Sequence, residues 1–335
     1  MTYSPAVLPR GIYTPFLPFH HKHDHDVYSR TIDIPRTLAH ISHLAESGIT
    51  GLIIPVLNEK SAYISHTELV SLIRSIRAHL SGLGYDKFIV IVATGVLSVR
   101  MALEQIDEVK GAGADFALVI PPKMKSGMCV LNGPAVMGFI HDVAQSSSLP
   151  MITYNSNFNS ANVTDGIDTV GVSNAIIHLT PPTPRIVGWK SACPDTNKLG
   201  RIAGIFTPVP SFCSSDFILP ALEAGAPAVV VSSANIVPRL CVRLYNLYRE
   251  GYSNGAKGLQ SELSRADETL GQVGDEGVNE LIAGCYGGGG GYGYGYSGDK
   301  SRRISRSSTE IPIHMSNNVD SLKLMRRLLE FEDGL

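Results

Sequence analysis

A lysine and a tyrosine, each at the end of an apolar run, are the residues of this sequence best suited to covalent chemistry. Lys190 ends RIVGWK (185–190) and Tyr154 ends PMITY (150–154). Lysine is rarely buried unless its charge is paired or used, and in a dry site its pKa falls because desolvation disfavours the charged form. A neutral amine attacks a ketone to form a Schiff base, and a nearby phenol shuttles protons. The pair therefore indicates imine chemistry.

Each residue also has a structural interpretation, which the residues alone leave open. Lys190 is consistent with a snorkelling lysine whose ammonium pairs with a carboxylate at the rim of the fold. Tyr154 alone is more typical of a core tyrosine with a hydrogen-bonded hydroxyl. Only the two together, on neighbouring elements, favour catalysis.

The elements that must position this pair are eight short apolar runs that alternate with segments of helical period. The runs are continuous and β-branched, which is typical of parallel strands covered on both faces. Eight such units favour an α/β fold of the (β/α)8 TIM-barrel type over an open doubly wound sheet, which stays the alternative. A barrel collects its active site at the C-terminal ends of its strands, and Tyr154 and Lys190 end the fifth and sixth. The predicted strands are 11–19, 51–56, 88–96, 116–122, 150–155, 185–192, 204–209 and 228–234, and the predicted helices include 31–48, 66–82, 98–113 and 215–225.

The composition changes after the eighth unit. We expect residues 1–250 to form the barrel and residues 251–335 to form a C-terminal helical extension. Within the extension, 286–310 is rich in Gly, Tyr and Ser and lacks apolar periodicity, so we expect it to be a disordered insertion. The sequence then predicts a final amphipathic helix at 319–332.

Composition and charge exclude several classes of partner. The formal net charge of −2 and pI near 6.6 give no electrostatic reason to bind nucleic acid or an anionic membrane. No run of 18 apolar residues occurs, so we expect no transmembrane span. The five cysteines form no CxxC pair, which favours a reducing compartment. The N-terminal sequence has neither a signal-peptide apolar region nor an Arg-rich amphipathic stretch, so we expect a cytoplasmic protein.

A histidine-rich stretch, FHHKHDHDVY (19–28), follows the first predicted strand. Imidazoles and carboxylates are competent metal ligands, but alternating spacing in a loop fixes no coordination geometry. We favour a solvated loop and predict no metal. A metal-dependent aldolase, in which the ion polarises the ketone, stays an alternative. The residues concerned are His20, His21, His23, Asp24, His25 and Asp26.

Several stretches together resemble one family, the dihydrodipicolinate synthase/N-acetylneuraminate lyase superfamily, over about residues 10–285. They are GIYTPF (11–16), GADFALVIPP (113–122), YN (154–155), VGWK with SACPDTNKL (187–199), and LEAGAPAVVVSSANIVPRLCVRLYNLYREG (222–251). The last is most similar to a fungal-type branch that includes aldolases of 2-keto-3-deoxy sugar acids and 4-hydroxy-2-oxoglutarate. The resemblance implies a TIM-barrel carbon–carbon lyase in which Lys190 forms the imine with pyruvate or another 2-oxo acid and Tyr154 relays protons. It also implies no cofactor and a homo-oligomer, typically a tetramer. As substrate-binding candidates we take Thr14, Asn58 and Val230.

The sequence departs from the family pattern at three places. PVLNEKSAYIS (55–65) replaces the usual G-T/S-T/N-G-E turn that holds the substrate carboxylate, and Asn58 is its remaining polar candidate. PPKMKSG (121–127) lacks the second tyrosine, and Asn157 stands where proline is expected in YNxP. Two alternatives therefore remain beside the aldolase. One is a dihydrodipicolinate synthase-like condensation or a dehydratase that uses the same imine chemistry, and the other is a degenerate barrel with a binding or regulatory role.

Overall fold

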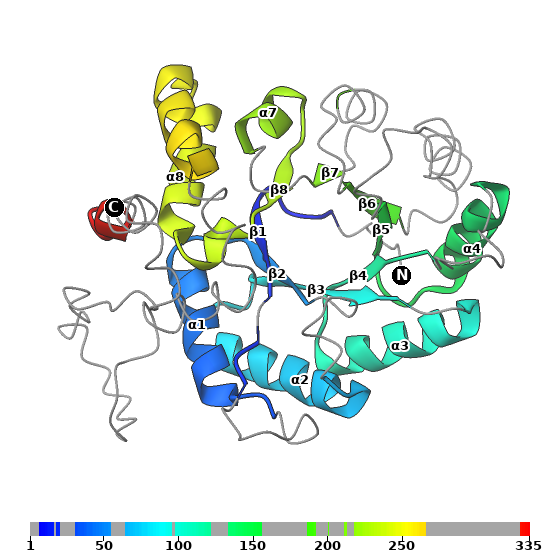
Figure 1. Ribbon diagram of the computed structural model, residues 1–335. Coiled ribbons are helices and arrows are strands. Elements are labelled where there is room, and N and C mark those ends of the chain that lie inside the picture. Colours follow the sequence, from blue (N-terminus) through cyan, green and yellow to red (C-terminus); the bar gives the residue numbers. More distant parts are fainter. Residues whose placement is uncertain are drawn as a thin grey trace, which may run out of the picture.

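The computed structural model describes residues 7–16, 18–20, 31–54, 64–95, 98–121, 133–155, 186–191, 200, 211–212, 218–265 and 329–335. Its centre is an eight-stranded parallel sheet with the order β7-β6-β5-β4-β3-β2-β1-β8. The end strands β7 and β8 lie beside each other, so the sheet curls round on itself (Figure 1). The strands are β1 Gly11–Pro15, β2 Gly51–Ile54, β3 Ile89–Thr94, β4 Phe116–Val119, β5 Met151–Asn155, β6 Ile186–Ser191, β7 Ser211–Phe212 and β8 Ala228–Val230.

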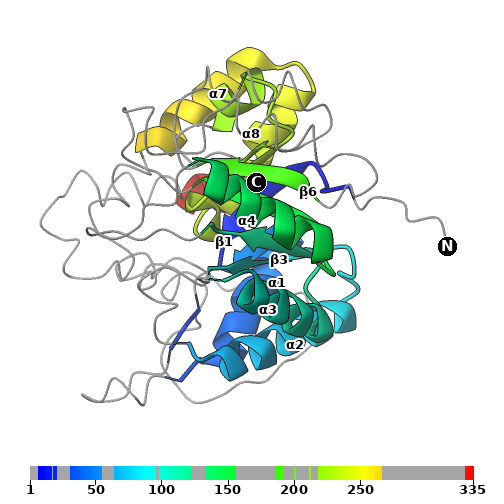
Figure 2. The same cartoon turned by 90° about the vertical axis from the view of Figure 1, so that its right-hand side faces the viewer.

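Helices surround this sheet on its outer side, as a TIM-barrel-like α/β fold requires (Figure 1). From the side, α2, α3 and α4 follow one another along the outside of the sheet (Figure 2). The helices are α1 Ile34–Glu46, α2 His66–Gly82, α3 Val99–Ala112, α4 Gly133–Ser146, α7 Ile218–Glu223 and α8 Pro238–Arg249, with a short 3₁₀ helix, η4 Ser233–Asn235, between β8 and α8.

The first three helices begin at side chains that accept hydrogen bonds from otherwise unpaired backbone N–H groups. Asp33 accepts from Arg36 at the start of α1, and Ser98 accepts from Met101 at the start of α3. At the start of α2, Ser65 and Glu68 form a reciprocal capping box. These local signals fix where each helix begins.

Helix α8 begins differently, because its N-cap residue is Val237, which has no side-chain acceptor. The acceptor comes from the end of the chain. The Glu332 carboxylate is fully buried and accepts hydrogen bonds from the backbone N–H groups of Arg239 and Leu240, both at 2.8 Å. A negative group at a helix N-terminus also interacts favourably with the helix dipole.

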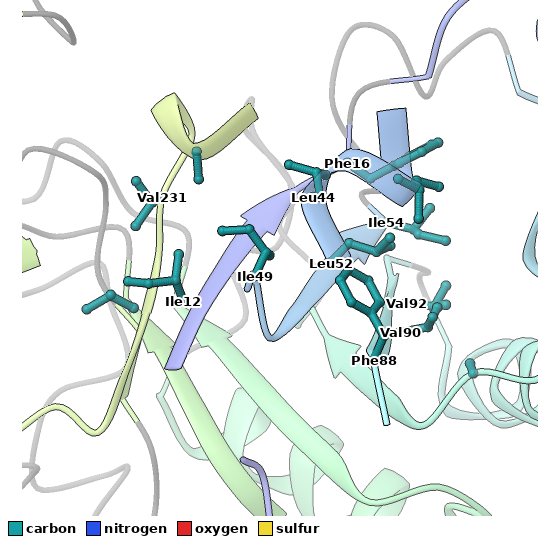
Figure 3. Close-up of a cluster of buried hydrophobic side chains, with 14 of the residues drawn as sticks. Ile12, Phe16, Leu44, Ile49, Leu52, Ile54, Phe88, Val90, Val92 and Val231 are labelled. Carbon is teal, nitrogen blue, oxygen red and sulfur yellow. The ribbon is translucent and has the colours of Figure 1, made fainter. Parts of the chain in front are cut away.

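Two apolar clusters separate the inside of the sheet from its outside. The outer cluster combines strand residues such as Leu52 and Val90 with helix residues such as Leu44, so it lies between sheet and helices (Figure 3). The inner cluster comes almost wholly from strands and fills the space that they enclose. Along β1 to β5 and β8, side chains alternate between the two clusters. The inner cluster consists of Leu8, Tyr13, Ile53, Ile91, Ala93, Phe116, Leu118, Ile152, Ala228 and Val230.

The predicted elements that fall on described residues agree with the structure in type and order, and differ mainly in length. The helix predicted at 66–82 is α2. The first predicted strand runs to residue 19, but β1 ends at Pro15. The eighth runs to residue 234, but η4 already occupies Ser233–Asn235. The strand predicted at 204–209 and the insertion predicted at 286–310 lie outside the described residues, and the described part of the predicted 319–332 helix is helical over 329–333.

No helix in the described parts of the chain is long and apolar enough to cross a membrane.

Candidate active site

Tyr154 and Lys190 are direct neighbours on adjacent parallel strands. They are register partners in the β5–β6 pair, and the Lys190 Nζ lies 3.7 Å from the centroid of the Tyr154 ring. A cation over an aromatic face at this distance is held by the ring quadrupole. Both side chains are partly buried, and Tyr154 packs against the inner cluster. The structure therefore brings together the two residues that the sequence selected, at the C-terminal ends of β5 and β6.

Burial also sets the protonation of the phenol. Desolvation raises the pKa of Tyr154 above its ordinary value of 10.0. At neutral pH the hydroxyl therefore carries its proton and can donate it, and the phenolate left behind is a stronger base than an exposed one. The phenol is therefore a proton donor at neutral pH, although the raised pKa makes it a weaker acid than an exposed tyrosine.

The three predicted substrate-binding residues fall in different places. Val230 belongs to the inner cluster and is the register partner of Tyr13, so it lines the enclosed space. Thr14 is fully buried and, because side chains alternate along β1, lies on the outer side of the sheet beside Ile12. Thr14 therefore does not share the inner side with Tyr154, and its role in substrate binding stays a prediction. Asn58 lies outside the described residues.

Trp189, the only tryptophan of the chain, is fully buried in the outer cluster, so its side chain points away from the space that the strands enclose.

The histidine-rich stretch is mostly outside the described residues, which include only His20 of its candidate ligands. Within the parts that the structure describes, no group of three or more His, Cys, Asp or Glu side chains is arranged to hold a metal ion.

One buried polar network beside the C-terminal end of β1 was not predicted from the sequence. Its centre is Asn235 in η4, whose Nδ2 donates to the carbonyls of Pro15 at 3.0 Å and Ser232 at 3.1 Å. Its Oδ1 lies 3.2 Å from Nε2 of His40 on α1. Burial lowers the pKa of His40 to about 4, against the smaller opposing effect of the Asn235 hydrogen bond. The network joins the end of β1 to the turn after β8.

The comparison with known families agrees with this geometry. A sequence model described as the dihydrodipicolinate synthetase family matches residues 18–275. The chain belongs to this family. Its Lys190 and Tyr154 both lie within the matched region.

Curated relatives in this family include fungal aldolases. One is named "Probable 4-hydroxy-2-oxoglutarate aldolase, mitochondrial", from Emericella nidulans, and is 31% identical over 77% of this chain and 79% of its own length. Another, an L-threo-3-deoxy-hexylosonate aldolase from Hypocrea jecorina, is 30% identical over 85% of this chain and 90% of its own length. The resemblance to a fungal-type branch of the family is therefore confirmed.

Solved structures of the family share the fold. A dihydrodipicolinate synthase family protein from Coccidioides immitis superposes with a TM-score of 0.75 at 22% identity, covering 99% of this chain and 100% of that one. A family member from E. coli in complex with pyruvate gives a TM-score of 0.72 at 19% identity, covering 95% and 98%.

Proposed function

We propose that the protein is a class I, Schiff-base aldolase that cleaves or forms a carbon–carbon bond next to a 2-oxo acid. The substrate class is pyruvate or a 2-oxo acid such as a 2-keto-3-deoxy sugar acid or 4-hydroxy-2-oxoglutarate. One observation carries the proposal: in a member of this family, the Lys190 amine lies over the Tyr154 ring at the ends of neighbouring strands. The names of the fungal relatives supply the substrate class.

The proposed reaction begins when the neutral Lys190 amine adds to the carbonyl carbon of the 2-oxo acid. Tyr154 donates its proton to the carbinolamine oxygen, which leaves as water and gives the protonated imine. The Tyr154 phenolate then takes the proton from the hydroxyl of the fourth carbon, and the bond between the third and fourth carbons breaks. An aldehyde departs and the bonding electrons move into the imine as an enamine. Protonation of the enamine and hydrolysis release pyruvate and regenerate the amine.

The protonated imine is the electron sink of this sequence, so the proposed chemistry requires neither metal nor organic cofactor. Activity that persists in EDTA would support this part of the proposal. Loss of activity in EDTA that added metal restores would favour the metal-dependent alternative instead.

The decisive test is chemical trapping. The protein is incubated with pyruvate, reduced with borohydride and digested for peptide mass spectrometry. We expect a reduced pyruvyl adduct on Lys190. Absence of an adduct with pyruvate and with a panel of 2-keto-3-deoxy acids would contradict the proposal and favour a degenerate barrel. An adduct without release of any aldehyde would point to a condensation or dehydration reaction of the same imine.

Three broader features belong to the same proposal. We propose that the curled sheet is a closed (β/α)8 barrel within residues 1–250, followed by a helical extension over 251–335. Helical residues at 253–265 and 329–333 support the extension.

Family resemblance supports a homotetramer, which light scattering would measure. Cysteine usage supports the cytoplasm, although one relative is named as mitochondrial, so cell fractionation would decide the location.

A further inference from the structure

Strand β6 contains an irregularity three residues before Lys190. Met151 on β5 pairs with Ile186 on β6, but the next residue, Ile152, pairs with Gly188. Val187 is therefore an extra residue that has no partner of its own on β5. An insertion of this kind is a β-bulge, which reverses the alternation of side chains beyond it.

The side chains of β6 show this reversal. Ile186 and Trp189 are three positions apart, and in a regular strand they would lie on opposite faces of the sheet. Both instead belong to the outer cluster, while Val187 packs against the inner one. Lys190 follows Trp189 and so points to the inner side, towards Tyr154. Without the bulge, Lys190 would share the outer side with Ile186.

Gly188 lies close to the side chain of Ile152 on the neighbouring strand. A Cβ atom at Gly188 would lie 3.1 Å from Cγ1 and 3.3 Å from Cγ2 of Ile152. Ile152 is fully buried in the inner cluster and has little room to move. The restriction is one of contact, because Gly188 is not among the described glycines with positive φ.

We propose that Gly188 is a positioning residue for the imine-forming lysine. Because Gly188 has no Cβ, the bulge can pack against Ile152. The bulge then directs Lys190 into the barrel and Trp189 outwards to the helices. This inference rests on the proposed function for its chemical consequence, but its geometric content can be tested separately.

The test compares wild-type protein with Gly188→Ala in the pyruvate–borohydride experiment. We expect the rate of adduct formation on Lys190 to fall, by less than the ~100-fold that a displacement of about 1 Å costs, because the contacts with Ile152 require a shift of only a few tenths of an ångström. Adding Ile152→Ala to the same chain removes both Cγ atoms that the new methyl group would meet. The double variant should recover most of the rate. The matched control is Gly138→Ala on α4, where an added Cβ would meet nothing within 4 Å, and its rate should equal that of wild type.

Trp189 provides a readout that does not depend on catalysis. As the only tryptophan of the chain, it reports the side on which the following residue lies. In Gly188→Ala we expect its emission maximum and its quenching by acrylamide to change, and in the double variant to return towards the wild-type values. A change in helix content by circular dichroism would separate general unfolding from local displacement. If Gly188→Ala does not fold, the test rests on the double variant. The proposal then requires that the double variant folds and forms the adduct.

The outcomes for the two proposals are distinct. Wild-type protein that forms no adduct contradicts the proposed function, while the Trp189 emission still tests the bulge. Wild-type protein that forms the adduct, together with a Gly188→Ala variant that forms it equally fast with unchanged Trp189 emission, overturns the positioning role. A double variant that stays as slow as Gly188→Ala would also overturn it, because the clash with Ile152 would then not be the cause.

Discussion

The sheet has a regular region, β1 to β4, and an irregular one, β5 with β6. From β1 to β4 every strand pair keeps one register from end to end. Between β5 and β6 the register shifts by one residue, and this is the pair that carries Tyr154 and Lys190. The regular region therefore acts as scaffold, while the irregular one sets the direction in which a reactive side chain points. If so, substitutions in the first region should change stability alone, and those in the second should change turnover at constant stability.

The largest expected effect is at Lys190. Lys190→Ala removes the amine that forms the imine, so aldolase activity should fall by at least about 10³-fold. Borohydride trapping should give no adduct, while the urea midpoint stays near that of wild type because the side chain is only partly buried. A Lys190→Ala variant that still forms a pyruvyl adduct on another lysine would place the chemistry elsewhere.

Tyr154 should show the next largest effect. Its substitution separates formation of the imine from cleavage of the carbon–carbon bond. Tyr154→Phe keeps the ring over which the Lys190 amine lies but removes the proton donor. We expect kcat to fall about 10²- to 10⁴-fold, the range for loss of a general acid–base group. The adduct on Lys190 should still form, though more slowly. Tyr154→Leu, which lacks the ring, should form it more slowly again; equal rates in the two variants would show that the ring has no part in holding the lysine.

Away from β5 and β6, His40 on α1 should make stability depend on pH. The unfolded chain binds a proton at His40 near pH 6.5, whereas the folded chain does so only near pH 4. The free energy of unfolding should therefore fall as the pH is lowered from 6.5 to 4, by about 3 kcal/mol for a shift of this size. His79 adds to the fall, because burial lowers its pKa as well. Urea titrations at several pH values would measure it.

The control for this prediction is His40→Gln, which keeps a hydrogen-bond donor near Asn235 but does not titrate. Its stability should vary less between pH 6.5 and 4 than that of wild type, whatever its absolute value. An identical slope in both proteins would mean that His40 does not cause the acid sensitivity.

The smallest expected effect is at Asp115, which links β3, β4 and α2. Its Oδ2 accepts hydrogen bonds from the Val90 backbone N–H at 2.8 Å and from Arg77 Nη2 at 2.5 Å. Asp115→Ala leaves both donors unpaired, which should cost about 2 kcal/mol of unfolding free energy. Its kcat and KM should match wild type. Asp107→Ala, on the exposed face of α3, is the matched control and should change stability little. Reduced kcat in a folded Asp115→Ala protein would contradict the expectation that substitutions in the regular region change stability alone.

The sequence predicted the scaffold well because its signals are local. Helix α2 coincides with its prediction, and its start is set by Ser65 and Glu68, only three residues apart. The order of the strands follows from their alternation with helices, and adjacent strand ends bring Tyr154 and Lys190 together. Strand lengths were less accurate, since continuous apolar runs such as 228–234 extend past the point where pairing stops.

The features that escaped prediction are those that depend on distant parts of the chain. A register shift is a property of two strands, so nothing within 185–192 reveals that Val187 lacks a partner. His40 and Asn235 are separated by 195 positions, and neither has a local motif that points to the other. Thr14 belongs to a stretch that resembles the family, but only the alternation seen in the structure shows on which side of β1 it lies.

The capping of α8 by Glu332 has a consequence for how the protein is made. A ribosome synthesises the Arg239 and Leu240 amides 93 and 92 residues before the carboxylate that will accept from them. Until Glu332 has been added, α8 must therefore begin without its acceptor. The nascent chain can form the capped starts of α1, α2 and α3 as it emerges, since Asp33, Ser65 and Ser98 lie within a few residues of the groups they cap. A stop codon placed shortly before Glu332 would release a chain in which α1, α2 and α3 keep their side-chain caps and α8 lacks its acceptor.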